Sequence, residues 1–288
     1  MITSAVADKP GEVPVAQDIV IEAGKSELHY WRDLWRYREL FYFLAWRDIL
    51  VRYKQTSIGI AWAVLQPLSM TFVGVFIFQY IAKLHSIPNV PYAIMVLAAQ
   101  LPWQFFSRAL SEASNSLINN TNLISKIYFP RLIIPAASVI TALIDFAISA
   151  ALLAIMMACY AFVPDWRIVA APFFLLLAIA AAVGAGLWFA ALNVSYRDFR
   201  YIVPFIVTIG ASVSPVAFST DNVPARFRFL YSLNPMVGVI DGFRWSLLRG
   251  NSQIYLPALA VSVVVISAVL VTGVMYFRAT EKRFADVI

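Results

Sequence analysis

The chain has 288 residues, of which 61% are hydrophobic and 13% are charged. Soluble globular domains carry about 25% charged residues, so this composition excludes an ordinary soluble enzyme or binding module. The formal net charge is +6, and the single cysteine, Cys159, excludes an intrachain disulfide framework.

Residues 1–28 lack the continuous apolar segment of a cleaved signal peptide and are predicted to form a flexible cytoplasmic tail. Residues 29–57 place aromatic side chains such as Trp31 and Trp35 at helical spacing among arginines. This pattern predicts an amphipathic helix in the lipid headgroup layer, although Arg38 interrupts its apolar face. A passive anchor and a gating helix are both consistent with the pattern.

Six apolar stretches, each long enough or nearly long enough to cross a bilayer, follow this helix. A hydrocarbon core about 30 Å thick needs about 20 mainly apolar residues in a helix. An open strand edge in lipid would leave backbone groups unpaired, so the predicted fold is an all-α integral membrane protein. The transmembrane domain is predicted over residues 58–278, with residues 279–288 as a cytoplasmic tail. The predicted spans are Ile58–Ala82, Tyr92–Leu110, Leu132–Phe162, Ile168–Val194, Tyr201–Phe218 and Leu256–Phe277.

The connections between the spans carry most of the polar residues. Ser114–Arg131 is too polar to cross lipid, but its leucines and isoleucines predict a short cytoplasmic helix with one apolar face. Thr220–Tyr255 interleaves apolar and charged residues and is broken at Asn234-Pro235. We expect two short amphipathic helices there that re-enter the outer leaflet, since irregular backbone at that depth needs protein or water around it.

The distribution of lysine and arginine predicts the orientation of the chain. With a cytoplasmic N-terminus and six spans, 16 of the 22 basic residues lie on the inner side and 6 on the outer side. Both termini are therefore predicted to be cytoplasmic by the positive-inside rule. Because the basic charge follows the membrane topology, a nucleic-acid partner is not expected.

The sequence offers no energy source for transport. Gly24-Lys25-Ser26 resembles the end of a phosphate-binding loop, but Ile19 stands where that pattern requires glycine. The acids of the loops are scattered singly, and His29 and His85 lie at opposite faces, so neither a metal site nor a membrane transferase is expected.

Ion-coupled transport is the other alternative, because it usually requires ionisable groups inside the membrane. Asp145 is the only acid well inside a predicted span, and no basic residue is expected beside it there. A mid-membrane charge is costly, so Asp145 should face protein or water rather than lipid. Replacing it by asparagine is predicted to leave ATP-dependent export largely intact.

Several short motifs occur in a fixed order around the spans. They are Arg52-Tyr53-Lys54-Gln55-Thr56 with Gly59, Trp62 and Pro67; Lys126 with Phe129-Pro130-Arg131; Tyr196-Arg197-Asp198; and Ser232-Leu233-Asn234-Pro235-Met236 followed by Gly242-Phe243-Arg244. Together they resemble the permease subunit of the ABC-2 transporter family, in its O-antigen and lipopolysaccharide export branch, over about residues 30–280. The resemblance implies a homodimer in the bacterial inner membrane, bound to two ABC ATPase subunits that carry ATP and magnesium. The implied substrate is a lipid-linked polysaccharide; capsule, teichoic acid or a small amphiphile is the alternative.

Three groups of residues are predicted to carry transport. ATPase coupling is assigned to Asn120, Asn122, Lys126, Tyr128, Arg131, Arg197, Asp198 and Arg200, with helix capping as the alternative for Arg197 and Asp198. The substrate path is assigned to the aromatic residues Trp62, Phe72, Phe76, Tyr80, Trp103 and Phe106, whose rings can stack on sugars or simply pack against lipid and helices. The outer gate is assigned to Asn234, Pro235, Asp241 and Arg244. No cofactor or metal is expected on this chain.

Overall fold

The computed structural model describes residues 27–54, 59–84, 86–127, 129–196, 198–252, 254–281 and 283–284. Within these ranges every regular element is a helix, which agrees with the predicted all-α class. Of the predicted tail 1–28, only Glu27 and Leu28 are described, and they begin the first helix. The elements are α1 (Glu27–Arg36), α2 (Arg38–Lys54), α3 (Gly59–Gly74), the π-helix η1 (Val75–Ile81), α4 (Tyr92–Asn119), α5 (Thr121–Lys126), α6 (Ile133–Cys159), η2 (Trp166–Ala170), α7 (Ala171–Ser195), α8 (Phe199–Val213), η3 (Thr220–Asn222), α9 (Ala225–Tyr231), α10 (Pro235–Leu247) and α11 (Leu256–Glu281).

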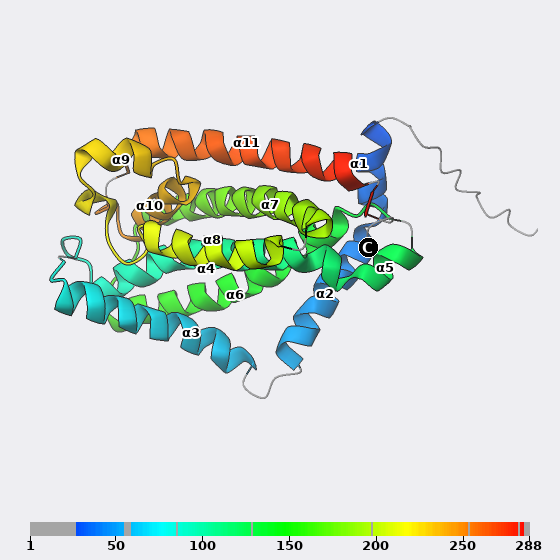
Figure 1. Cartoon of the computed structure of the whole chain (residues 1–288). Coiled ribbons are helices and arrows are strands. Elements are labelled where there is room, and N and C mark those ends of the chain that lie inside the picture. The colour runs from blue at the N-terminus through cyan, green and yellow to red at the C-terminus, as the bar shows by residue number, and fades with distance from the viewer. Residues whose placement is uncertain are drawn as a thin grey trace, which may run out of the picture.

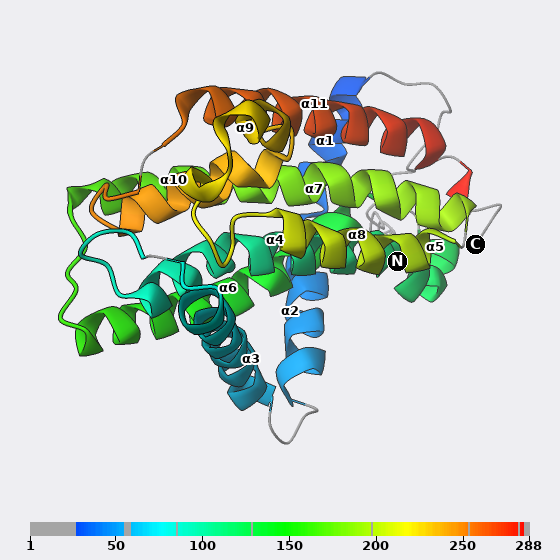
Figure 2. The same cartoon turned by 60° about the vertical axis from the view of Figure 1, so that its left-hand side comes forward.

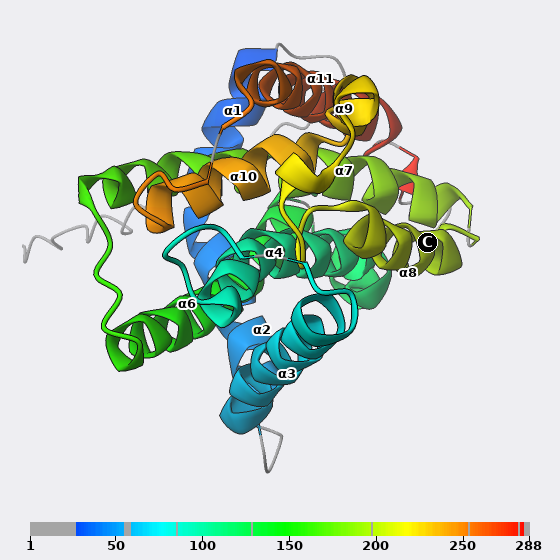
Figure 3. The same cartoon turned by 90° about the vertical axis from the view of Figure 1, so that its left-hand side faces the viewer.

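Helix α4 is the centre of the bundle, because it packs against both α6 and α7. Helix α11 packs on α7, and α3 and α8 lie on the outside of the bundle beside α4 (Figure 3). The α5 end of the bundle holds α1, α5 and the last turn of α11, while α9 and α10 lie at the opposite end, the α10 end (Figure 1). The described residues assigned to ATPase coupling and those assigned to the outer gate therefore lie at opposite ends.

Four segments of the described chain are long and apolar enough to cross a membrane: Ala61–Ile81, Ile133–Cys159, Trp166–Ser195 and Leu256–Glu281. They coincide with four of the six predicted spans. The last one continues to Glu281, into the segment predicted as a C-terminal tail.

Helix α4 ends at Asn119, whereas the sequence predicts an end near Leu110 or a turn or two further. Its polar last turns avoid lipid by packing inside the protein. The buried Ser116 hydroxyl donates to the Ala113 carbonyl (2.7 Å), and Asn193 of α7 donates to the Ser114 carbonyl (3.0 Å). The predicted short helix of the connection is accordingly limited to α5.

Helix α8 is shorter than predicted: it is apolar but has only 15 residues, since the helix ends at Val213 and the following residues up to Ser219 are irregular. The predicted interface helix over 29–57 is also divided, because a turn at Tyr37 separates α1 from α2. Helix α2 runs at a steep angle to the long helices (Figure 2) and buries Leu44 and Ala45 against the bundle. Residues 55–58 lie outside the described ranges.

The predicted pair of helices after the fifth span is present as α9 and α10, separated at Ser232–Asn234. The sequence predicts an amphipathic helix here, but α10 has no exposed polar face. Helices α4, α7 and α11 all pack against it, and nearly all of its residues are buried. It is therefore part of the core at the α10 end.

Helices α7 and α11 approach so closely that their contact has room for glycine only. A Cβ at Gly184 would lie 2.7 Å from the Leu270 backbone, whereas at Gly74 the nearest atom would be a Val96 methyl carbon at 3.2 Å. Close approach of helices through small residues is typical of membrane bundles.

We expect Gly184→Ala to destabilise the protein by about 1–3 kcal/mol, the usual cost of overpacking. The matched control Gly74→Ala should stay within about 1 kcal/mol of the wild type, because a side-chain methyl can move and alanine favours a helix. Thermal unfolding of the purified protein measures both changes. Equal midpoints for the two variants would contradict the close α7–α11 contact.

Candidate functional site

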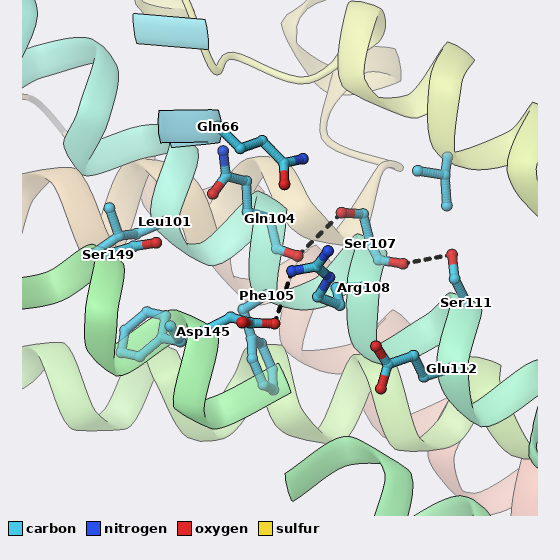
Figure 4. A pocket seen from close by; sticks show the side chains of 12 residues that line it. Gln66, Leu101, Gln104, Phe105, Ser107, Arg108, Ser111, Glu112, Asp145 and Ser149 are labelled. Carbon is cyan, nitrogen blue, oxygen red and sulfur yellow. Dashed lines mark hydrogen bonds and ion pairs between the residues drawn. The ribbon is translucent and has the colours of Figure 1, made fainter. Parts of the chain in front are cut away.

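A polar cavity of about 310 Å³ lies between α3, α4, α6 and α8 (Figure 4). Its volume is in the range of small-molecule pockets. Polar side chains and a minority of apolar ones share its surface. The lining residues are Gln66, Leu101, Gln104, Phe105, Ser107, Arg108, Ser111, Glu112, Asp145, Phe146, Ser149 and Val207.

The spacing of residues on α4 explains why this cavity is polar. Ser107 and Arg108 each lie three or four residues from both Gln104 and Ser111, so the four side chains share one face of the helix. The opposite face carries Ala109 and other small or aliphatic residues that pack in the core. A single helix thus presents a polar stripe to the cavity and an apolar stripe to its neighbours.

Three of the lining residues, Arg108, Glu112 and Asp145, belong to a cluster of charged residues and a tyrosine from three helices. We call it the charge cluster: Arg52, Tyr53, Arg108, Glu112 and Asp145. Asp145 Oδ2 of α6 accepts from Arg108 of α4 at 2.8 Å and from Arg52 of α2 at 2.9 Å. Arg52 also pairs with Glu112 of α4, and the Tyr53 hydroxyl donates to Asp145 Oδ1. Figure 4 shows Arg108 pointing toward Asp145.

The cluster places two cations against two carboxylates, so its formal charge is balanced. The Asp145 side chain is 13% exposed and that of Arg52 is 22% exposed. Burial, and then the hydrogen bond to Asp145, raises the pKa of the Tyr53 phenol, which therefore stays protonated and donates to the carboxylate.

The prediction that Asp145 faces protein is confirmed by these contacts. The expectation that no base accompanies it is wrong. Because α4 continues well past Leu110, Arg108 lies inside the helix at the level of Asp145 and pairs with it.

The aromatic residues predicted for the substrate path fall into two groups. Trp62, Phe72, Phe76 and Tyr80 are exposed along α3 and η1, where the rings of Phe72 and Phe76 and those of Phe76 and Tyr80 lie 6.4 and 6.5 Å apart. We call these four residues the aromatic ridge.

Trp103 and Phe106 of α4 are separate from the ridge. Their rings contact each other at 5.7 Å, and Trp103 is buried against Gly210 of α8. Trp103 therefore packs helices together.

The described residues predicted to couple to an ATPase lie at the α5 end, where some are exposed and others are wholly or partly buried between helices. Asn122 and Lys126 are exposed on α5, and Asp198 and Arg200 are exposed at the start of α8. Asp198 makes no side-chain capping bond to α8, so the capping alternative is not supported for it. Tyr128 and Arg197 lie outside the described residues.

Asn120 and Arg131 hold helices together at the same end. Asn120 is buried and accepts from Arg47 of α2 at 2.7 Å. The Arg131 backbone N–H donates to Glu281 Oε1 of α11 at 2.7 Å, and the Tyr30 hydroxyl of α1 donates to Glu281 Oε2 at 3.0 Å. Helices α1 and α11 are thus joined to the residue that leads into α6.

The residues predicted as an outer gate fasten α10 to the segment that follows α8. Asn234 Oδ1 accepts from the Met236 N–H at 3.1 Å as the cap of α10, and its amide donates to Ser214 at 3.0 Å. Pro235 is the first residue of that helix.

Arg244 is fully buried, 3.9 Å from Asp241, and donates to the Pro215, Val216 and Phe218 carbonyls at 2.8, 3.2 and 3.1 Å. Asp241 is also buried. Both side chains are thus held inside the protein, between α10 and the segment that follows α8.

The three predicted groups of transport residues omit Arg52, Arg108, Glu112 and Glu281, whose side chains make ion pairs or hydrogen bonds between helices. One signal in the sequence is the four-residue spacing of Gln104, Arg108 and Glu112 within an apolar stretch. The described ranges contain no group of three His, Cys, Asp or Glu residues that would hold a metal ion.

The ABC-2 type transporter family model matches residues 39–248. The O-antigen export system permease protein RfbA of Myxococcus xanthus is 27% identical over 257 residues, covering 88% of this chain and 97% of the relative. RfbA of Klebsiella pneumoniae is 25% identical over 247 residues, covering 84% and 92%. The capsule polysaccharide export inner-membrane protein CtrC of Neisseria meningitidis serogroup B is 27% identical over 226 residues, covering 75% and 81%.

The charge cluster predicts that Asp145→Asn destabilises the protein, because two arginines lose the carboxylate they share. The cost should be about 1–3 kcal/mol, below that of a fully buried pair since the cluster is partly exposed. At about 2–4 °C per kcal/mol, the thermal midpoint should fall by several degrees. The control Asp48→Asn removes a surface pair with the adjacent Arg47 and should change stability by less than about 1 kcal/mol. Similar midpoints for both variants would contradict the role of the cluster.

Proposed function

The chain belongs to the ABC-2 type transporter family, and we propose that it is the permease subunit of an ATP-driven exporter of O-antigen-type, lipid-linked polysaccharide. The observation that carries this proposal is the likeness to two O-antigen export permeases over 84% or more of the chain and nearly the whole of each relative. Capsule polysaccharide is the second candidate substrate, favoured by the likeness to CtrC.

Energy for transport comes from a separate ABC ATPase, since this chain has no phosphate-binding loop. Two ATPase subunits, which hold ATP and magnesium, bind a homodimer of the permease. The docking surface on each permease is α5 with its exposed Asn122 and Lys126, joined by Asp198 and Arg200 at the start of α8. An ATPase can move the permease only through surfaces that it contacts, and α5 protrudes at the end of the bundle (Figure 1).

The chain crosses the bacterial inner membrane six times, with both termini and the α5 end in the cytoplasm. The four apolar helices supply four crossings. Helix α4, with 28 residues and a length of about 42 Å, is a fifth; its polar stripe faces the cavity and not lipid. Helix α8 is about 22 Å long and crosses together with the segment that Arg244 holds.

The polysaccharide passes along the outward face of α3 and α8, where two permeases meet. Support comes from the exposed side chains there: the aromatic ridge on α3, and Tyr201, Phe205 and Ile209 on α8. Flat rings stack on the C–H faces of sugars without binding one unit tightly. The polar cavity lies beside this face and offers amide, hydroxyl and charged groups to sugar hydroxyls.

Movement at the docking surface reaches the substrate path through α2. Asn120, next to α5, is bonded to Arg47 of α2, and Arg52, five residues further along α2, is bonded to α4 and α6 at the cavity. A tilt of α5 that displaces Asn120 therefore moves α2, and with it the contacts that Arg52 makes at the cavity. Opening and closing of the cavity then follows the state of the ATPase.

The proposal is tested in proteoliposomes that contain the permease and its ATPase, with lipid-linked polysaccharide on the ATPase side. ATP should make the glycan accessible on the opposite side, and omission of the ATPase should abolish this. Lys126→Glu should lower export or ATPase binding several-fold, because it reverses a charge on α5. Lys83→Glu reverses an exposed charge in the segment between η1 and α4, a segment that lies at the α10 end (Figure 1), and should leave both export and ATPase binding unchanged.

Uphill export by the permease alone would contradict the assignment of function. Normal export and normal complex yield with Lys126→Glu would contradict the assignment of the docking surface while leaving the function intact.

A further inference from the structure

A second cavity, of about 550 Å³, lies between α6, η2, α7 and α10 toward the α10 end. All the residues that line it are apolar. Leu153, Met157, Phe162 and Leu247 form buried walls, and Ala154 contributes a small side chain. Such a cavity has nothing to offer a sugar or an ion, but it suits a hydrocarbon chain.

Leu101 and Phe146 line both this apolar cavity and the polar cavity, so they form the partition between the two. The ring of Phe146 packs edge to face against the rings of Phe105 of α4 and Phe243 of α10, with ring centroids 6.0 and 5.9 Å apart. Whatever fills the apolar cavity therefore supports the wall of the polar one.

Two arginines are fixed at the rim of the apolar cavity. Arg249 donates through Nε to the carbonyl of Val163 and lies over the ring of Phe162 at 4.8 Å, and both of those residues line the cavity. Arg167 donates to the Arg249 carbonyl and lies over the ring of Trp245 at 5.5 Å. Their positions are thus set by backbone and ring contacts.

The charge at the rim is positive. Asp165, 3.7 Å from Arg167, pairs with that arginine, so the two arginines and this carboxylate together carry a formal charge of +1. Each guanidinium has five N–H donors, more than these contacts use, and guanidinium binds phosphate oxygens in a two-pronged geometry.

The rim also has the composition of a membrane interface. Tyr160, Val163, Trp166 and Val169 are 55%, 65%, 73% and 77% exposed. Exposed tyrosine and tryptophan beside apolar residues mark the level of the lipid headgroups. The mouth of the cavity therefore opens where a lipid presents its phosphate above and its acyl chains below.

We propose that this cavity binds one anionic phospholipid, with an acyl chain between α6, α7 and α10 and its phosphate group at Arg167 and Arg249. The volume is in the range of pockets that hold small ligands. The apolar lining selects the acyl chain of the lipid, and the two arginines select its anionic headgroup. This site does not depend on the identity of the exported substrate.

The experiment is native mass spectrometry of the full chain in detergent, titrated with phosphatidylglycerol or with phosphatidylcholine of the same acyl chains. One variant, Arg167→Gln/Arg249→Gln, removes the headgroup contacts. A second, Ala154→Phe, fills the cavity without changing charge. The control Arg226→Gln removes an exposed arginine of α9, whose cation lies over Phe227 and not at the cavity. Thermal unfolding of each variant reports whether it is folded. If only one of the two test variants folds, its lipid binding alone tests the proposal.

The wild type should bind phosphatidylglycerol more tightly than phosphatidylcholine. The double arginine variant should weaken phosphatidylglycerol binding about tenfold and leave phosphatidylcholine binding unchanged. Ala154→Phe should weaken the binding of both lipids, and Arg226→Gln should match the wild type. These results support the site.

Equal phosphatidylglycerol binding by the wild type and the folded test variants would overturn the proposal. Displacement of the lipid by millimolar inorganic phosphate would show a site for the phosphate alone and would overturn it too. A polyprenyl phosphate that displaces phosphatidylglycerol at lower concentration would overturn the choice of occupant.

Discussion

The need to pair charges inside an apolar bundle is the constraint on which the rest of this structure depends. Arg52, Arg108, Glu112 and Asp145 come from three helices, and any one of them left alone in this environment would be costly. Their pairing fixes α2 against α4 and α6. A partly buried ion pair adds little stability relative to apolar packing, but removing one partner leaves the other charge unpaired, so the cluster favours one position of α2.

Two further groups of polar contacts fix the helices to one another, one group at each end of the bundle. At the α5 end, Glu281 accepts from Arg131 and Tyr30 and so joins α11, α1 and the start of α6. At the α10 end, buried Arg244 donates to three carbonyls and holds the segment after α8 on α10. Between these ends the helices pack through small residues such as Gly184 and Gly273. The proposed transport cycle thus acts on closely packed helices whose ends are fixed by these polar contacts.

The fold class and four spans follow from the sequence because hydropathy over about 20 residues is a local property. The Asn234-Pro235 break is also local, because proline at the first helical position and asparagine as the cap need only each other. The length of α4 could not be predicted in this way. Its last turns are polar, and only the three-dimensional contacts of Ser114 and Ser116 with α7 and with their own helix show that they are inside the protein.

The candidate site was the least predictable part for the same reason. Asp145 and Arg108 are 37 positions apart, and Asp145 and Tyr53 are 92 apart, so no local pattern connects them. The sequence assigns the aromatic residues of α3 and of α4 to one path, but those of α3 are exposed, whereas Trp103 of α4 is buried against Gly210. A ring is buried where a neighbouring helix places a small residue, such as Gly210, opposite it, and the spacing of the aromatic residues does not reveal this.

A double-mutant cycle on Arg52 and Asp145 tests most directly whether α2 is held to the bundle by their charges. The free energy of unfolding is measured for the wild type, Arg52→Gln, Asp145→Asn and the double variant. Residues in one ion-pair network should show a coupling energy of about 1–2 kcal/mol, so the double variant loses less than the sum of the single losses. Losses that add to within about 0.5 kcal/mol would contradict the account.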